Sequence, residues 1–204
     1  MISNILEIFQ SSGENSPHST LLNLQWEILC SQGPSQEMMG YCLSLFSLSI
    51  IRYSFLEKVI ISLALETDIE SFQPFVKLKF LEKTGDNLYL LHESARDFLR
   101  NKLEESSNSE NVKGAFGSAI CIAAKYFFTD SATNIVDLGQ DIPHIAKAVK
   151  DLRPFCNTDT LSLLEILQGC LYRDRGYSAK ALEKFDSALS IIREDLIKTI
   201  RLTE

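Results

Sequence analysis

The sequence predicts a mainly α-helical protein that contains a single two-stranded β-hairpin. Apolar residues recur at helical spacing along most of the 204 residues. Residues 80–91 depart from that spacing, because two short apolar segments flank a turn in which Gly85 and Asn87 suit a positive φ. After residue 161, small residues alternate with large ones, as in two helices that approach closely. The helical spacing and the pattern after residue 161 predict helices, and residues 80–91 predict the hairpin.

Composition restricts the possible functions. The formal net charge is -7 and the sequence pI is near 5.1, whereas nucleic-acid-binding proteins usually present a basic face. The 5 cysteines form no C-x-x-C pair, so we expect reduced thiols of an intracellular, cytoplasmic protein. His18, His92 and His144 lack ligand spacing, which predicts no metal site. The apolar run at residues 38–51 is shorter than the roughly 18 residues of a membrane span, so we expect a buried helix and no membrane association.

The first 33 residues are expected to form a helical arm. Residues 2–9 have an amphipathic pattern, and residues 11–18 have the composition of a polar loop. We expect Ser19 or Thr20 to cap a second helix, because a hydroxyl can accept from a free N–H of the first turn. That helix should end near Gly33 and Pro34.

Residues 34–104 have the element order of a winged-helix domain. The apolar run from residue 35 or 36 to Ile50 predicts a helix that lies at the centre, because it is apolar on nearly all sides. Ser54 is expected to cap a fourth helix that extends to about residue 65. A short fifth element is expected to open at residue 68 or 71 and to end near residue 78, with a proline early in it.

The hairpin and the helix after it complete this order. Residues 80–83 and 88–91 are the expected strands, and a helix should begin directly after His92. A hairpin that leads into a helix without a break is the second half of a winged helix. We therefore expect a winged-helix domain over residues 34–104.

Residues 105–158 are expected to form a helical connector. Residues 104–113 are polar and predict a linker. A helix is expected at residues 116–128, with Ile120, Ala123, Ala124 and Phe127 facing inward. Asp141 is expected to cap a further helix with Pro143 near its first position, and that helix should end near residue 152.

Residues 159–204 have a pattern of their own. Two helices are expected on either side of a turn at residues 173–176. Small residues stand where these helices would approach each other: Gly169, Ala181, Ala188. Large residues are expected to fill the space between the helices: Tyr172, Tyr177, Phe185. This pattern resembles the tetratricopeptide signature over about one repeat of 34 residues. The resemblance implies a helical hairpin, followed by the start of a further helix, that presents Tyr172, Tyr177 and Phe185 to a protein partner. The usual closing proline is missing, so residues 192–202 should continue as one helix.

Residues 92–99, His-Glu-Ser-Ala-Arg-Asp-Phe-Leu, are similar to a motif of STAND-class signalling NTPases, the NACHT and NB-ARC families. The resemblance covers about residues 21–128, and a tetratricopeptide array often follows this region in those families. It implies that His92 approaches the β-phosphate of ADP held by a nucleotide-binding domain. An imidazole can donate to a phosphate oxygen. The alternative is that His92 only caps the junction between hairpin and helix.

One departure from these families is large. The chain contains no G-x-x-x-x-G-K-[ST] sequence, and no run of four apolar residues that ends in an acidic residue stands out as a Walker B motif. We therefore expect no nucleotide hydrolysis by this chain alone. The resemblance implies either a C-terminal piece of a larger ATPase or a degenerate relative, with ADP or ATP reaching it only through an associated nucleotide-binding domain, in cis or in trans.

Three classes of function remain to be weighed. The first is a non-catalytic regulatory and protein-interaction module, in which the winged helix docks on a nucleotide-binding domain and the helical repeat binds a partner protein. The alternative is a DNA-binding winged helix, whose reading element would carry only Lys77 and Lys79. An enzyme is disfavoured, because the sequence has no G-x-S-x-G and no H-E-x-x-H.

Overall fold

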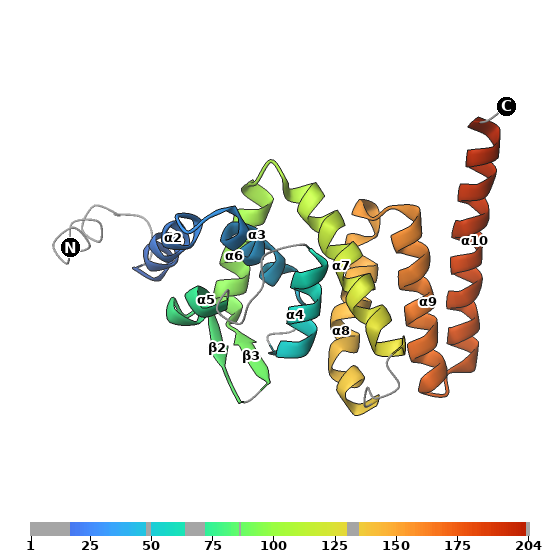
Figure 1. Ribbon diagram of the computed structural model, residues 1–204, viewed down its shortest axis with the longest axis horizontal. Helices are drawn as coiled ribbons and strands as arrows, with labels where there is room; N and C mark the ends of the chain where they lie inside the picture. Colours follow the sequence, from blue (N-terminus) through green and yellow to red (C-terminus); the bar gives the residue numbers. More distant parts are fainter. Residues whose placement is uncertain (1–16, 48–49, 64–71, 86, 130–134, 203–204) are drawn as a thin grey trace.

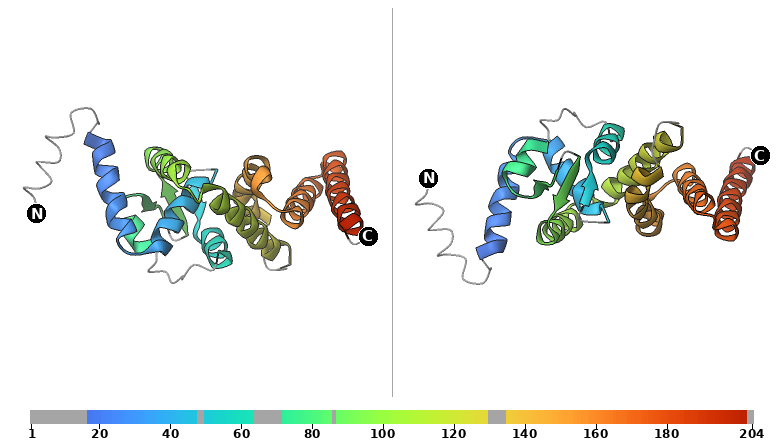
Figure 2. Two further views of the ribbon diagram at one scale, coloured as in Figure 1. Left: turned by 90° about the horizontal axis from the view of Figure 1, so that it is seen from above. Right: turned by 90° about the horizontal axis from the view of Figure 1, so that it is seen from below.

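The chain is mainly helical and contains a small antiparallel sheet, as predicted, and its body is elongated. A computed structural model describes residues 17–47, 50–63, 72–85, 87–129 and 135–202. Helix α2 (Pro17–Cys30) lies at one end and helix α10 (Ser178–Leu202) at the other, as Figure 1 shows from the front and Figure 2 from above and below. The helix expected at residues 2–9 lies outside the described residues.

The remaining elements follow between these two helices. In chain order they are α3 (Pro34–Leu45), β1 (Ile50–Arg52), α4 (Tyr53–Ser62), α5 (Gln73–Lys77), β2 (Leu81–Lys83), β3 (Leu88–Leu91), α6 (Glu93–Glu105), α7 (Ser109–Thr129), α8 (Ile135–Leu152), the 3-10 turn η2 (Arg153–Phe155) and α9 (Thr158–Asp174).

The predicted hairpin is confirmed, and it belongs to a three-stranded sheet of order β1-β3-β2. Leu81 is opposite Leu91, and the Thr84 N–H donates to the Leu88 carbonyl at 3.0 Å across the turn. Gly85 has a φ of 134°, as expected. The φ of Asn87 depends on residue 86, which lies outside the described residues. The carbonyl of Asn87 accepts from the Tyr53 N–H at 2.8 Å.

Strand β1 corrects the helix expected to run through Ile50. Helix α3 ends at Leu45, and Phe46 leaves it with an extended backbone (φ -65°, ψ 142°) and a side chain that is 1% exposed. Ile50 then pairs with Leu90 in the sheet, facing outward, while Ile51 is fully buried. A short apolar run with β-branched residues is compatible with either helix or strand, and here the free edge of β3 determines the outcome.

Two predicted helix caps and the predicted linker are also wrong. Helix α2 begins at Pro17, so Ser19 and Thr20 lie inside its first turns, which follows from the tolerance of proline at the first helical position. Helix α4 begins after Arg52 rather than at Ser54. Most of residues 104–113 are helical, because most of their polar side chains lie on exposed faces of α6 and α7. Only residues 106–108 separate the two helices.

Helix α7 occupies the middle of the molecule. It packs against α3 and α4 on one side and against α8 and α9 on the other. Its buried residues Phe116, Ile120, Ala123 and Ala124 belong to one cluster of apolar side chains that extends from Leu22 in α2 to Leu171 in α9. The inward positions expected for Ile120, Ala123 and Ala124 are confirmed, whereas the side chain of Phe127 lies outside the described residues.

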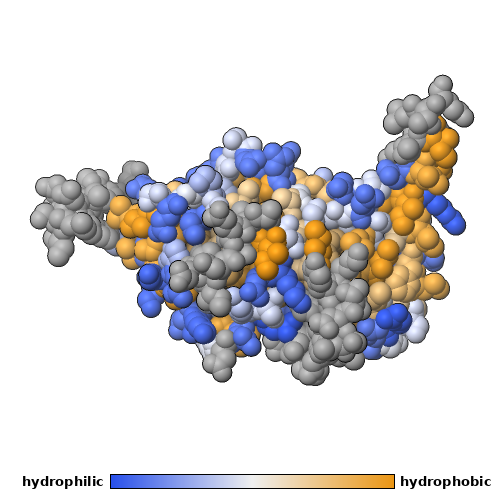
Figure 3. All heavy atoms as spheres, in the orientation of Figure 1, coloured by the Kyte–Doolittle hydropathy of each residue, from blue (hydrophilic) through white to orange (hydrophobic). Residues whose placement is uncertain are grey.

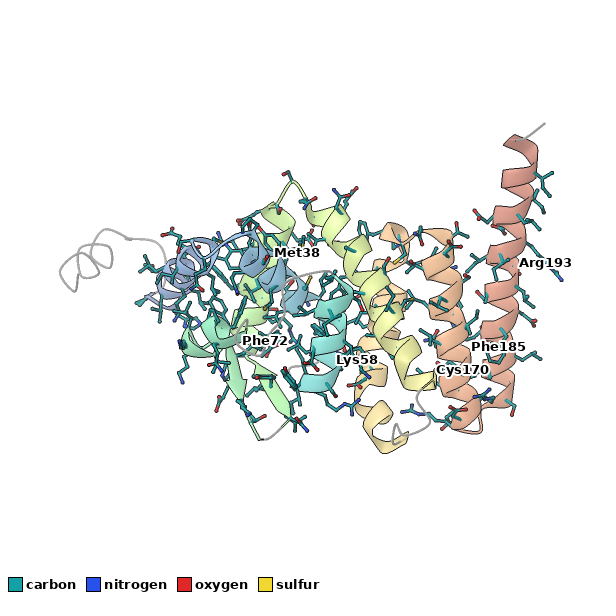
Figure 4. The ribbon with its side chains drawn as sticks, in the orientation of Figure 1. Met38, Lys58, Phe72, Cys170, Phe185 and Arg193 are labelled. Atoms are coloured by element: carbon teal, nitrogen blue, oxygen red, sulfur yellow. The ribbon has the colours of Figure 1, made fainter. Side chains whose placement is uncertain are left out.

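Helices α9 and α10 form the expected helical hairpin. Gly176 has a φ of 79° in the turn between them, and Ala181 and Ala188 are buried. At Gly169 a Cβ atom would lie 2.5 Å from Cε1 of Phe185, so the absence of a side chain permits the close approach. Figure 4 shows Phe185 on α10 in the part of the hairpin next to α9. Helix α10 continues to Leu202 without a break, as predicted.

We expect Gly169→Val to destabilise the protein by about 1–3 kcal/mol, because the added atoms overlap the ring of Phe185 in a packed interface. Ala179→Val, at an exposed position of α10, is the matched control and should cost less than about 1 kcal/mol. Urea unfolding measures both values. Equal costs for the two variants would show that α9 and α10 do not approach closely at Gly169.

Candidate functional site

His92 lies where the sequence placed it, between β3 and α6. Its carbonyl accepts from the Arg96 N–H at 2.9 Å, but its side chain makes no capping hydrogen bond. Nε2 of His92 lies 3.3 Å from Oε2 of Glu82, and the two side chains are 47% and 55% exposed. An ion pair this exposed contributes little to stability. The backbone of His92 therefore caps α6, while the imidazole stays accessible at the surface.

Two arginines of α6 attach this helix to the end of α3. Arg96 Nη1 donates to the Ser47 carbonyl at 3.3 Å, and Arg100 Nη2 donates to the Ser44 carbonyl at 3.2 Å. Ser44 belongs to the last turn of α3, where carbonyls lack partners within the helix and attract cations, and Ser47 lies just after the helix. Arg96 also lies 4.0 Å from Glu93, one turn away on the same helix. These bonds fix the orientation of α6 and so the position of His92 at its start.

A buried ion pair joins the sheet to α8. Arg52 Nε lies 3.1 Å from both carboxylate oxygens of Asp141, and Arg52 Nη2 also contacts Oδ2. The side chain of Asp141 is 1% exposed and that of Arg52 is 11% exposed. Asp141 is thus not the helix cap that the sequence suggested. It lies inside α8, because the guanidinium of Arg52 satisfies its carboxylate there.

His144 stands beside this pair, at the next turn of α8. The N–H and the hydroxyl of Ser47 both lie 3.1 Å from its Nδ1, so Nδ1 is the acceptor. Nε2 then carries the proton and donates to the Ile50 carbonyl at 3.3 Å. Burial lowers the pKa of His144 to about 4, opposed in part by the bond to Ile50. The imidazole is therefore neutral near pH 7, with both nitrogens hydrogen-bonded.

Two phenylalanine rings contact His144, and a third packs against one of them. Phe46 lies edge-on to it, with ring centroids 5.2 Å apart, and Phe55 stacks on it at 5.8 Å. Phe46 in turn contacts Phe55 at 6.1 Å and Phe116 at 5.2 Å. These residues come from α4, α7, α8 and the segment after α3. We call them, with Arg52 and Asp141, the α8 joint: Phe46, Arg52, Phe55, Phe116, Asp141, His144.

The α8 joint contains residue types found in hydrolases but not their arrangement. Asp141 binds Arg52 and so does not orient the imidazole of His144. The low pKa of His144 makes it a weak general base, and its side chain is almost fully buried. Ser47 and His144 therefore bond two segments together, a structural role.

The two buried cysteines are unsuited to nucleophilic chemistry. All 5 are free thiols; Cys42 and Cys121 are buried, and burial raises the pKa of each to about 12. A thiol of that pKa stays protonated at neutral pH. Within the described ranges, no group of three His, Cys, Asp or Glu side chains is placed to hold a metal ion. None of the described helices is long and apolar enough to cross a membrane.

The three aromatic residues expected to bind a partner differ in exposure. The rings of Tyr172 and Tyr177 meet edge to face with centroids 6.4 Å apart, and Lys180 Nζ lies 5.7 Å and 5.5 Å from the two centroids. Tyr177 was expected to fill the space between the two helices, but its side chain is 55% exposed. Phe185 is half-buried against Gly169. Tyr172 and Tyr177 thus form a surface patch around the turn, separate from His92.

Sequence reasoning missed the α8 joint. Arg52 and Asp141 are 89 positions apart, and neither belongs to a recognisable motif. One signal existed in the chain: Asp141 and His144 are three positions apart among Ile145 and Ala148, which places two polar groups on an apolar helix face. Polar groups on a buried face require partners elsewhere in the fold.

Comparisons of the chain with protein-family profiles, with curated protein sequences and with solved structures gave no match.

Removing one member of the Arg52–Asp141 pair should be costly. Asp141→Ala leaves a buried guanidinium without its counter-ion, and we expect it to lower the free energy of unfolding by about 3–5 kcal/mol. Glu105→Ala, which breaks the exposed pair with Lys102, is the control and should change it by less than about 1 kcal/mol. Arg52→Met/Asp141→Leu should cost less than Asp141→Ala. A double variant as unstable as the single one would contradict this account.

The stability of the protein should fall in mildly acidic solution because of His144. Its folded-state pKa of about 4 lies below the ordinary 6.5, so the unfolded chain binds the proton more tightly. Stability is thus complete above pH 6.5 and is lost as pH falls towards 4, by about 3 kcal/mol, since one pKa unit is worth about 1.4 kcal/mol.

The pH dependence can be assigned by comparing two histidine variants. Denaturant unfolding of His144→Gln between pH 7 and pH 4 should show a smaller loss than the wild type, because glutamine does not titrate. His92→Gln changes an exposed histidine and should retain the wild-type loss. If both variants follow the wild type, His144 is not the group responsible.

Proposed function

We propose that the chain is a non-catalytic regulatory and protein-interaction module of a STAND-type ATPase. In this proposal residues 34–104 form a winged helix that docks on a nucleotide-binding domain, supplied in cis or in trans. The order α3-β1-α4-α5-β2-β3, with the β2–β3 hairpin at the edge of a small sheet, supports this assignment. The tetratricopeptide-like hairpin of α9 and α10 then binds a partner protein.

The observation that carries the proposal is the accessible imidazole of His92 at a rigid junction. Capping of α6 uses only the backbone of this residue, so its exposed side chain can exchange its contact with Glu82 for one with a phosphate oxygen of ADP. Arg96 and Arg100 hold α6 in place, which positions the imidazole in advance. A ligand contact made only in the docked state would shift the equilibrium between docked and released winged helix.

Docking on a protein is favoured over reading DNA. Helix α5, which would be the reading element, spans only five residues, Gln73–Lys77. Lys77 at its end and Lys79 just beyond it are exposed cations. Two cations give few phosphate contacts, and such contacts dominate the affinity for DNA. A gel shift that weakens with salt would revive the DNA-binding alternative.

The proposal predicts that His92 tightens the binding of ADP. Fluorescent ADP titrated into a STAND-class nucleotide-binding domain should bind about tenfold more tightly when the chain is present, the gain from one charge-assisted hydrogen bond. His92→Ala should remove this gain while the chain still docks. His18→Ala, at an exposed histidine of α2, is the matched control and should retain it.

The titration tests the docking of the chain and the role of the imidazole separately. No effect of the wild-type chain on ADP binding would contradict docking on that domain. A gain that His92→Ala retains would support docking but contradict the role of the imidazole.

A further inference from the structure

Helix α10 has a second apolar face in addition to the one packed on α9. Ala181 and Ala188 face α9 and are buried. Four large apolar residues on a neighbouring face are exposed by 45–61%: Leu182, Leu189, Ile192, Leu196. A surface helix normally carries one apolar stripe, with polar residues opposite. We therefore expect another molecule to cover the second apolar stripe of α10.

The spacing of this stripe is that of a helix-pairing seam. Phe185 packs against Gly169 of α9 and is not part of this seam. Leu182, Leu189 and Leu196 are seven positions apart, and Ile192 stands three positions after Leu189. These are the a and d positions of a heptad repeat, which meet another helix along a narrow apolar line. A seam of this kind fits a helix as the occupant, rather than a small molecule.

Most of the stripe lies alongside α9, because Thr158 at the start of α9 hydrogen-bonds Asp195 of α10 at 3.2 Å. Leu196 continues the stripe onto the turns that project beyond α9. Helix α9 ends at Asp174 and begins at Thr158, whereas α10 is 25 residues long, and its C-terminal turns project beyond α9 (Figure 1). Figure 3 shows apolar side chains as a continuous band along this projecting part. Soluble monomers rarely expose contiguous apolar patches of more than a few hundred Å².

Charged residues beside the seam indicate which helix binds there. Asp186 and Arg193 both follow a d position directly and are exposed on the side of the seam away from α9. Arg193 points away from α9 in Figure 4. If a second α10 runs antiparallel, Asp186 of each copy lies beside Arg193 of the other, which forms two symmetric ion pairs. A parallel copy offers Arg193 no acidic residue, because the positions on the opposite side of the seam turn towards α9.

We propose that α10 is a self-association surface, on which a second copy of this chain docks antiparallel through Leu182, Leu189, Ile192 and Leu196. The inference rests on the proposed protein-binding role of the α9–α10 hairpin and specifies its partner. Such a contact uses the same patch on both copies and closes as a twofold dimer. Helix α6, which begins directly after His92, lies away from α10 (Figure 1), so the dimer leaves His92 accessible.

Sedimentation equilibrium of the wild-type chain tests the dimer. Leu189→Glu places a charge in the centre of the seam and should weaken dimerisation at least about 30-fold, the loss typical of a central interface side chain. Ile61→Glu is the matched control, since Ile61 is 57% exposed on α4, away from the seam. A wild-type chain that remains monomeric, or a dimer that Leu189→Glu leaves intact, would overturn the inference.

Charge reversal tests the antiparallel arrangement. Asp186→Arg alone sets arginine against Arg193 of the second copy, and Arg193→Asp alone sets two aspartates together, so each variant should dimerise about tenfold more weakly. A mixture of the two variants restores both ion pairs and should form a mixed dimer. Single variants that dimerise as well as the wild type, or a mixture that stays monomeric, would overturn this arrangement.

The two proposals fail separately. If the chain is monomeric but still tightens ADP binding through His92, the self-association inference is wrong and the proposed function stands. If the chain dimerises through α10 without any effect on a nucleotide-binding domain, the proposed docking is wrong and the self-association surface stands.

Discussion

The buried ion pair between Arg52 and Asp141 is the constraint on which the arrangement of the molecule depends. It connects the edge strand of the sheet to the middle of α8, and the hydrogen bonds of His144 to Ser47 and Ile50 lie beside it. A charge withdrawn from water is tolerated only with a well-placed partner, so few alternative packings can satisfy both groups. The apolar contacts of α7 supply the driving force, and this pair selects the packing.

This arrangement separates the two surfaces to which we assign functions. His92 is held at the start of α6 by bonds to the end of α3, and the seam on α10 lies at the far end of the chain. Between them, α7, α8 and α9 form a continuous apolar core. A module of this shape can present one surface to a nucleotide-binding domain and the other to a second copy, so docking and assembly need not compete.

Local signals in the sequence predicted the parts of the fold that form locally. The turn around Gly85 predicted the hairpin, and the Gly169–Phe185 contact was expected from the spacing of small and large residues. The position of His92 was also predicted. Strand β1 was missed because an apolar run adopts a strand only when β3 offers an edge, and the interior position of Asp141 depends on Arg52, which is distant in sequence.

The central claim is that the α8 joint unites the sheet-containing part and the α7–α9 part in one cooperative unit. Native-state hydrogen exchange measured residue by residue tests it most directly. The account predicts that the slowest amides of β3, α7 and α8 all exchange with the free energy of global unfolding, since the Arg52–Asp141 pair must break for any of them to open. Amides of α8 that exchange far faster than those of β3 would show that the two parts unfold independently, and would contradict the account.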